Sequence, residues 1–245
     1  MVHLVAGTIA IIPARGGSKR IPGKNVVDFH GHPLLAWTIE AALACERFAR
    51  VIVSTDAEDI AEIAVRYGAE VPFLRSSLAD DHTASSLVTL QCLEQAEAQF
   101  GLEFQTVAQL LPTCPLRTEV HIADAVDHFV GQGIAFQISV VDYGGANPWW
   151  AHTREESGIG HPAFPDKLAA RSQDLPRVYC PTGAIWLADS VALKKARNFY
   201  GPGYALWSID RLAGIDIDDG DDLALARGAF QQFEQKRSMP GARKS

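Results

Sequence analysis

The front of the chain contains a stretch whose residue types suit the binding of phosphate. Its sequence, IPARGGSKRIPGKN at residues 12–25, holds three glycines, no acidic residue and four cations, Arg15, Lys19, Arg20 and Lys24. Glycine lets a backbone curl closely around an anion, so that amide N–H groups point at it while Arg and Lys neutralise it. The spacing fits neither G-x-x-x-x-G-K-[ST] nor G-x-G-x-x-G. We therefore predict a phosphate-binding loop of another kind. The alternative is an ordinary basic surface loop.

A second charged stretch lies near the end of the chain, where IDIDDGDD at residues 215–222 contains five aspartates. In a strand, Asp216 and Asp218 would point to the same face. Two carboxylates on one face are suitable ligands for Mg²⁺, which prefers oxygen and shares its coordination with phosphates. We expect the other three, Asp219, Asp221 and Asp222, to favour the N-terminus of a following helix.

The elements that must position these groups are short apolar strands that alternate with helical patterns. Strands are expected at Ile9–Ile12, Val51–Val53, Thr106–Leu111, Phe136–Val141, Gly183–Ala188 and Tyr204–Ile209. Helices are expected from Pro33 to Phe48, from a cap at Asp56 to Gly68, over Thr83–Phe100, from a cap at Thr118 to Gly133, and from Asp218 or Asp219 to Gln235. This order predicts an α/β fold with a mostly parallel open sheet flanked by helices.

Such a fold would gather the charged stretches at one place, because ligands of open parallel sheets bind beyond the carboxyl ends of the strands. The basic loop, residues 54–56, residues 112–118 and the Asp216/Asp218 pair all follow expected strands. A cationic loop that faces a magnesium pair fits a nucleoside triphosphate. Phosphoryl-transfer chemistry needs mainly alignment and charge neutralisation from the protein.

Length and composition narrow the classes of protein further. The 245 residues are 47% apolar and carry a net charge of −7, which fits one large folded domain and argues against nucleic-acid binding. No apolar run is long enough to span a membrane, and no secretory signal begins the chain, so we expect a cytoplasmic protein. We expect one domain over residues 1–235, with an inserted arm at about residues 143–181 that is rich in Gly, Pro, His and Trp, and a flexible tail at 236–245.

Several stretches together resemble one family. They are IPARGGSKRIPGKN, VSTDAEDIAEIAVRYGAEVPFLR, TASS, LPTCPLRT, RSQDLP, TGAIW and IDID, in order from Ile9 to Ala226. The chain is similar to the acylneuraminate cytidylyltransferases, or CMP-sialic acid synthetases, a group that includes enzymes for pseudaminic and legionaminic acid. The resemblance implies a nucleotide-diphospho-sugar transferase-like, Rossmann-like fold with a dimerisation arm, and a homodimer. It also implies transfer of CMP from CTP to the anomeric hydroxyl of an acidic nine-carbon sugar, with Mg²⁺ as cofactor and pyrophosphate as second product.

The resemblance also assigns roles to residues at matching positions. The catalytic residues would be Arg15, Lys24 and Asp218, and the metal ligands Asp216 and Asp218. The nucleotide would be bound by Ala14, Arg15, Ser18, Lys24, Asn25, Arg75, Ser85 and Ser86. The sugar would be bound by Arg171, Gln173, Phe199 and Tyr200.

Each of these roles has a structural alternative. Ser85 and Ser86 could be helix caps, Arg75 a solvated loop charge, and Phe199 and Tyr200 plain core. Arg117 is expected to pair with a carboxylate.

The chain departs from the family pattern at three positions. Leu111 stands where many relatives have Gln, Cys114 where they have Ser, and Cys180 where many sialic-acid enzymes have Arg. Because a thiol cannot replace a bidentate guanidinium, the loss of that Arg leaves the identity of the sugar open. Two rival functions also stay open: a CMP-Kdo synthetase, and a non-catalytic nucleotide-binding relative.

Overall fold

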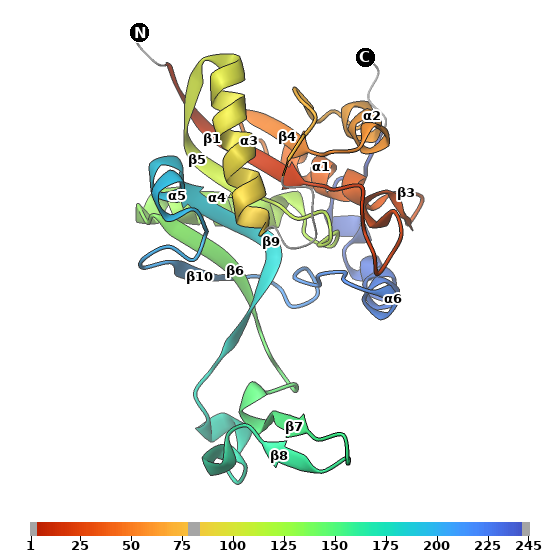
Figure 1. Ribbon diagram of the computed structural model, residues 1–245, viewed down its shortest axis with the longest axis vertical. Coiled ribbons are helices and arrows are strands. Elements are labelled where there is room, and N and C mark those ends of the chain that lie inside the picture. The colour runs from red at the N-terminus through yellow and green to blue at the C-terminus, as the bar shows by residue number, and fades with distance from the viewer. Residues whose placement is uncertain (1–3, 78–83, 242–245) are drawn as a thin grey trace.

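The computed structural model describes residues 4–77 and 84–241. Its centre is a six-stranded sheet in the order β10-β6-β9-β5-β1-β4 (Figure 1). The strands are β1 (Leu4–Pro13), β4 (Arg50–Ser54), β5 (Leu102–Gln109), β6 (Phe136–Asp142), β9 (Tyr179–Asp189) and β10 (Ala205–Ser208). Strand β9 runs antiparallel to both of its neighbours, and all other pairs are parallel. The prediction of a mostly parallel sheet is therefore confirmed.

Helices cover both faces of this sheet. They are α1 (Leu34–Ala44), α2 (Glu58–Arg66), α3 (Ser85–Phe100), α4 (Glu119–Gln132), α5 (Ser190–Ala196) and α6 (Gly220–Ala229). Along β1, Ala10 and Ile12 join the core under α1, α2, α4 and α6, whereas Ile9 and Ile11 join the core under α3 and α5. A strand buried on both faces must be apolar at every position, which explains the continuous run of Ile9–Ile12.

The expected helix ends are correct where the chain carries a specific terminal residue. Thr118 is the N-cap of α4 in a capping box, and Gly68, at φ 95°, follows α2 in the left-handed region that favours glycine. The predicted cap at Asp56 is wrong, because α2 begins after Ala57 and the Asp56 carboxylate is used elsewhere. The expected start of the long helix at Thr83 lies outside the described residues, and α3 begins at Ser85.

The inserted segment between β6 and β9 extends away from the body as an arm (Figure 1). Its hairpin consists of β7 (His152–Arg154) and β8 (Gly160–Pro162). The indole N–H of Trp149 donates to the Pro176 carbonyl at 2.8 Å, and its ring packs edge-on against Phe164. Trp149 therefore packs within the arm.

The remaining elements are short. A small hairpin joins β2 (Asp28–Phe29) to β3 (His32–Pro33), and 3-10 turns lie at Lys24–Val26, Pro148–Trp150, Pro165–Lys167, Ser172–Asp174, Phe230–Gln232 and Glu234–Lys236. The final helix therefore ends at Ala229 rather than at Gln235. Among the described residues, no helix is both long and apolar enough to cross a bilayer.

The expectation of a free C-terminal tail is wrong for Arg237 and Ser238. The Arg237 side chain is buried, donates from Nη1 to the Pro115 carbonyl at 2.7 Å, and lies 4.4 Å above the Trp37 ring. The Ser238 amide donates to Glu119 Oε1 at 2.9 Å. These contacts attach residues 237 and 238 to α1, to Pro115 and to the first residue of α4.

Candidate active site

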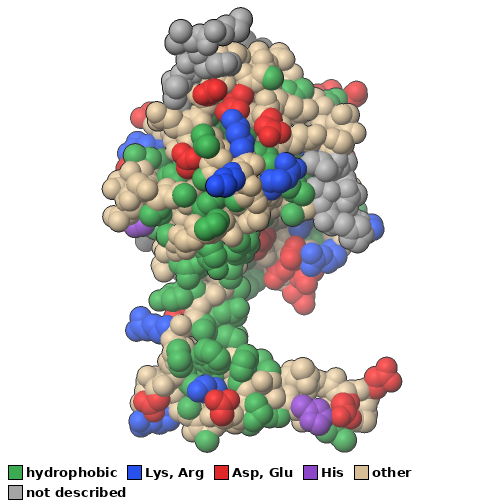
Figure 2. Space-filling model, turned by 60° about the vertical axis from the view of Figure 1, so that its left-hand side comes forward, with side chains coloured by type: hydrophobic (Ala, Val, Ile, Leu, Met, Phe, Trp, Pro, Cys, Tyr) green, Lys and Arg blue, Asp and Glu red, His purple; other side chains and the backbone are tan. Residues whose placement is uncertain are grey.

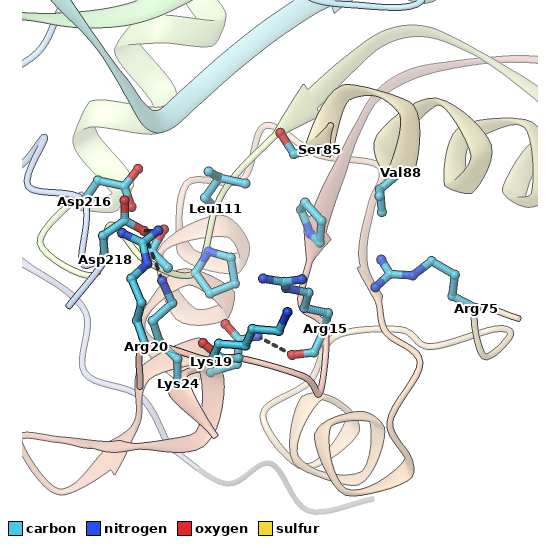
Figure 3. A pocket seen from close by; sticks show the side chains of 15 residues that line it. Arg15, Lys19, Arg20, Lys24, Arg75, Ser85, Val88, Leu111, Asp216 and Asp218 are labelled. Carbon is cyan, nitrogen blue, oxygen red and sulfur yellow. Dashed lines mark hydrogen bonds and ion pairs between the residues drawn. The ribbon is translucent and has the colours of Figure 1, made fainter. Parts of the chain in front are cut away.

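A polar cavity of about 540 Å³ opens at the carboxyl ends of β1 and β5 (Figure 3). Pro13 ends β1, and Leu111 to Thr113 follow β5. The cavity is lined by Pro13, Arg15, Ser18, Lys19, Arg20, Lys24, Asn25, Arg75, Ser85, Val88, Leu111, Pro112, Thr113, Asp216 and Asp218. The fold thus brings both charged stretches of the sequence to one place, as the edge of a parallel sheet predicts.

The cationic loop is braced by its own neighbours. Asn25 Nδ2 donates to the Arg15 carbonyl at 2.8 Å, and Gly23 takes a left-handed conformation with φ 62°. The Gly16 amide donates to Asp56 Oδ1 at 3.0 Å. That amide therefore supports the loop, and the expectation that the glycine amides face an anion does not hold for Gly16.

The acidic pair lies opposite this loop. Lys24 Nζ donates to the Ile217 carbonyl at 2.8 Å and lies 3.4 Å from Asp218 Oδ1, which also lies 3.0 Å from Arg20 Nη2. Asp216 is mostly buried, and desolvation raises the pKa of its carboxyl, opposed by a hydrogen bond from Thr113. Two cations, Arg20 and Lys24, thus lie beside the pair Asp216 and Asp218 (Figure 3).

The expectation that a strand presents the two aspartates is wrong, since residues 215–218 belong to no strand. The Ile217 amide nevertheless donates to the Thr113 carbonyl at 2.8 Å. Ile217 is buried in the core, whereas Asp216 and Asp218 line the cavity. The two aspartates therefore lie on the same side of this segment, as they would in a strand, although these residues are not part of one. The prediction for Asp219 is confirmed, because its carboxylate caps α6 by accepting from two following amides.

The other end of the cavity is formed by Arg75, Ser85 and Val88 (Figure 3). Arg75 is no solvated loop charge: only 4% of its side chain is exposed, and burial lowers the pKa of its guanidinium. Ser85 Oγ accepts from Gln109 Nε2 at 3.2 Å, and α3 has no side-chain cap, so neither serine is a cap. Ser86 is buried and does not line the cavity.

The other predicted contact residues lie away from this cavity. Ala14 is buried beneath the loop, and its amide donates to the Ser54 carbonyl. Phe199 is fully buried against Trp186, so the core alternative is correct for it, whereas Tyr200 is 46% exposed on the surface. Arg171 and Gln173 lie in the arm, where Arg171 pairs with Asp174.

Two residues behind the cavity wall have roles other than those predicted from the sequence. Arg117 is completely buried and donates to the carbonyls of Leu111 and Ala184 and to Thr38 Oγ. Burial lowers the pKa of this guanidinium to about 10. The expected carboxylate partner is absent among the described residues, and Arg117 instead fixes the Leu111 wall. The second residue is Asp56, which contacts both the cationic loop and Arg75.

An α/β sheet with a cationic loop and two carboxylates at its carboxyl edge defines a nucleotidyltransferase-type site. Residues 9–143 match the family model described as "Cytidylyltransferase". The chain belongs to the cytidylyltransferase family, as its motifs predicted.

Relatives of known activity class support the same assignment. A pseudaminic acid cytidylyltransferase of Campylobacter jejuni is 33% identical over 89% of this chain and 94% of the relative. A CMP-N,N'-diacetyllegionaminic acid synthase of Legionella pneumophila is 34% identical over 89% and 93%. An N-acylneuraminate cytidylyltransferase of Escherichia coli is 33% identical over 89% of this chain and 51% of that longer protein.

Solved structures share the fold at lower identity. A CMP:2-keto-3-deoxy-manno-octonic acid synthetase complexed with CTP aligns with a TM-score of 0.69 and 16% identity, over 93% of this chain and 99% of the other. A 4-diphosphocytidyl-2C-methyl-D-erythritol synthase of Anaerococcus prevotii aligns with a TM-score of 0.62 and 13% identity, over 94% and 99%. At these identities the likeness concerns the fold alone.

Proposed function

We propose that this enzyme transfers CMP from CTP to the anomeric hydroxyl of a nonulosonic acid. The hydroxyl oxygen forms a bond to the α-phosphorus, the bond from that phosphorus to the bridging oxygen breaks, and pyrophosphate leaves. The observation that carries the proposal is the contact of Lys24 with Asp218, which unites the cationic loop and the acidic pair in one cavity.

The residues that line the cavity form two groups, one suited to the triphosphate of CTP and the other to its cytidine. Arg15, Ser18 and Lys24 are proposed to hold the triphosphate, and their charge would be most useful on the departing pyrophosphate. Arg75 and Ser85, at the far end of the cavity, are proposed to read the cytidine, with Asn25 beside the nucleoside. A fixed set of cations and donors is the main contribution that phosphoryl transfer requires from a protein.

A magnesium ion is part of the proposal, with Asp216 and Asp218 as its ligands. The two residues fit this ion, because both offer only oxygen and both line the cavity where the phosphates are proposed to lie. Asp216 is a largely desolvated carboxylate beside a second one, an arrangement that a bound cation stabilises. When bound, Mg²⁺ supplies neutralisation of phosphate charge and lowers the pKa of a coordinated hydroxyl.

A homodimer is also proposed, and the arm supports it. Large apolar side chains are exposed along the arm, namely Trp150, Ile159, Phe164, Leu168 and Tyr179. Figure 2 shows apolar side chains gathered on the arm and where the arm joins the body. Arg171 and Gln173, the predicted sugar ligands, lie on this arm and do not line the cavity of their own chain. A role for them in sugar binding therefore needs the cavity of a second copy.

The cytoplasm is the proposed compartment, where thiols stay reduced. The four free cysteines support it.

The rival function, activation of the eight-carbon acid Kdo, is less supported. Three relatives above 30% identity are named for pseudaminic, legionaminic and N-acylneuraminic acid, whereas the Kdo enzyme of known structure shares 16% identity.

Pyrophosphate release from CTP and Mg²⁺ tests the proposal across a panel of pseudaminic, legionaminic and N-acetylneuraminic acids with Kdo. We expect release with at least one nonulosonic acid and much less with Kdo. Preference for Kdo would favour the rival enzyme, and no release with any acid would favour the non-catalytic alternative.

Gel filtration and light scattering of the same preparation test the proposed homodimer and should give the mass of a dimer.

A further inference from the structure

Asp56 connects two parts of the cavity wall without lining the cavity itself. Its Oδ1 accepts from the Gly16 amide at 3.0 Å and lies 3.4 Å from Arg75 Nη2. Its side chain is 25% exposed, whereas that of Arg75 is 4% exposed. One carboxylate oxygen therefore contacts both the cationic loop and the buried guanidinium.

Backbone hydrogen bonds hold the same three segments together. The Ala14 amide donates to the Ser54 carbonyl at 2.9 Å, and the Arg75 amide donates to the Thr55 carbonyl at 2.7 Å. A Cβ added at Gly16 would lie 2.9 Å from Ala57 Cβ, so the loop approaches the start of α2 closely. The backbone thus fixes which segments meet, and the Asp56 side chain sets the direction of the Gly16 amide and of the Arg75 guanidinium.

The negative charge of Asp56 lies beside the buried positive charge of Arg75. The Arg75 side chain is desolvated, and among the described residues its Nε makes no hydrogen bond. Arg15 is close enough to oppose the positive charge of Arg75, whereas Asp56 favours it. The negative charge beside the Arg75 guanidinium thus offsets the repulsion that this buried cation experiences from Arg15.

We infer that Asp56 is a positioning residue that aligns the loop proposed to hold the triphosphate with the arginine proposed to read the base. The inference rests on the proposed function. Through its two contacts, Asp56 sets the spacing between the base and the phosphates of one nucleotide. Loss of its charge should therefore weaken recognition of the base, and loss of both contacts should also slow the transfer.

Two substitutions separate these effects. Asp56→Asn keeps an acceptor for the Gly16 amide but removes the charge beside Arg75. We expect it to raise the KM for CTP by roughly 10-fold, the scale for a hydrogen bond to a charged group, with kcat little changed. We expect the preference for CTP over UTP to fall by a similar factor. Asp56→Ala removes both contacts and should lower kcat as well, by roughly 10- to 100-fold.

Glu58→Gln is the matched control, because it removes one carboxylate from the exposed first turn of α2. It should leave KM, kcat and the CTP preference unchanged. In an Arg75→Ala background, Asp56→Asn should have no further effect on KM. Thermal unfolding checks the fold, and if Asp56→Ala does not fold, Asp56→Asn and the double variant decide the question.

Wild-type KM and wild-type CTP preference in Asp56→Asn would overturn the inference, as would an undiminished effect in the Arg75→Ala background. Failure of the proposed function looks different, since the unmodified protein would then release no pyrophosphate with any acid of the panel. In that case calorimetric binding of CTP and UTP to the same variants still tests Asp56. Equal affinities in the unmodified protein and Asp56→Asn would contradict its role.

Discussion

Lys24 Nζ lies 3.4 Å from Asp218 Oδ1, although 194 positions of the chain separate the two residues. The same nitrogen donates to the Ile217 carbonyl at 2.8 Å, and only 14% of the Lys24 side chain is exposed. The contact between this partly buried lysine and the carboxylate joins the two charged stretches into one site. The following predictions start from this site.

Replacement of Asp218 should remove activity and leave the fold intact. The Asp218 side chain is 53% exposed and lies at the cavity mouth, so Asp218→Ala should change the unfolding temperature little. Turnover should fall by more than about 100-fold, the scale for loss of one electrostatic group at a reacting centre. Asp221→Ala is the control, since that exposed aspartate lies in the first turn of α6 outside the cavity. Full turnover in Asp218→Ala would contradict the metal role.

Replacement of Arg15 should affect kcat more than the binding of CTP. Arg15 lines the middle of the cavity, where Figure 3 shows its guanidinium between the acidic pair and Arg75. If it stabilises charge on the departing pyrophosphate, Arg15→Ala should lower kcat by roughly 100-fold or more. Arg66→Ala, on the exposed end of α2, provides the control for loss of one cation. An unchanged kcat would exclude Arg15 from the chemistry.

Gly183 should tolerate no side chain, because Asp216 occupies the space beside it. A Cβ at this position would overlap the Leu111 side chain and lie 2.9 Å from Asp216 Oδ2. Gly183→Ala should therefore displace a proposed metal ligand and raise the Mg²⁺ concentration needed for half-maximal activity. Gly131→Ala, in α4 with no atom within 4 Å of the added Cβ, should retain activity and gain up to about 1 kcal/mol of stability. Equal Mg²⁺ dependence in the two variants would contradict this account.

The buried thiols should resist alkylation in the folded protein. Burial raises the pKa of Cys45 to about 11 and that of Cys92 to about 12. Iodoacetamide at pH 8 should therefore modify the partly exposed Cys180 first, as peptide mass spectrometry would reveal.

The raised pKa values of Cys45 and Cys92 also contribute to the free energy of unfolding. This contribution is complete below about pH 9 and is lost as the pH rises through 11 to 12, because the unfolded chain releases these protons more readily. Chemical denaturation between pH 8 and pH 11 measures this loss.

Local signals predicted much of the fold. Thr118, Gly68 and Asp219 end or begin helices where expected, because the hydrogen bonds that make a cap involve residues within a few positions. The two charged stretches were predicted to converge, because parallel strands present their carboxyl ends at one edge. The direction of β9 could not be predicted, since an apolar run looks the same whichever way its strand is inserted.

The errors concern side chains whose partners are distant in the sequence. Asp56 resembles a helix cap in its local context, yet its carboxylate contacts Gly16, 40 positions away. Arg117 was expected to pair with a carboxylate, yet its guanidinium donates to Ala184 and Thr38 inside the core. Arg237 belongs to a polar end segment, yet it packs above the Trp37 ring. One sequence contains no record of such contacts, because each depends on tertiary packing.

The contact between Lys24 and Asp218 also has a consequence for synthesis of the protein on the ribosome. A nascent chain that has emerged as far as α4 already carries the cationic loop, but not the carboxylates that neutralise it. The nucleotide cavity cannot assemble until residue 218 has left the exit tunnel. Prematurely terminated products would therefore lack the acidic side of the cavity, formed by Asp216 and Asp218.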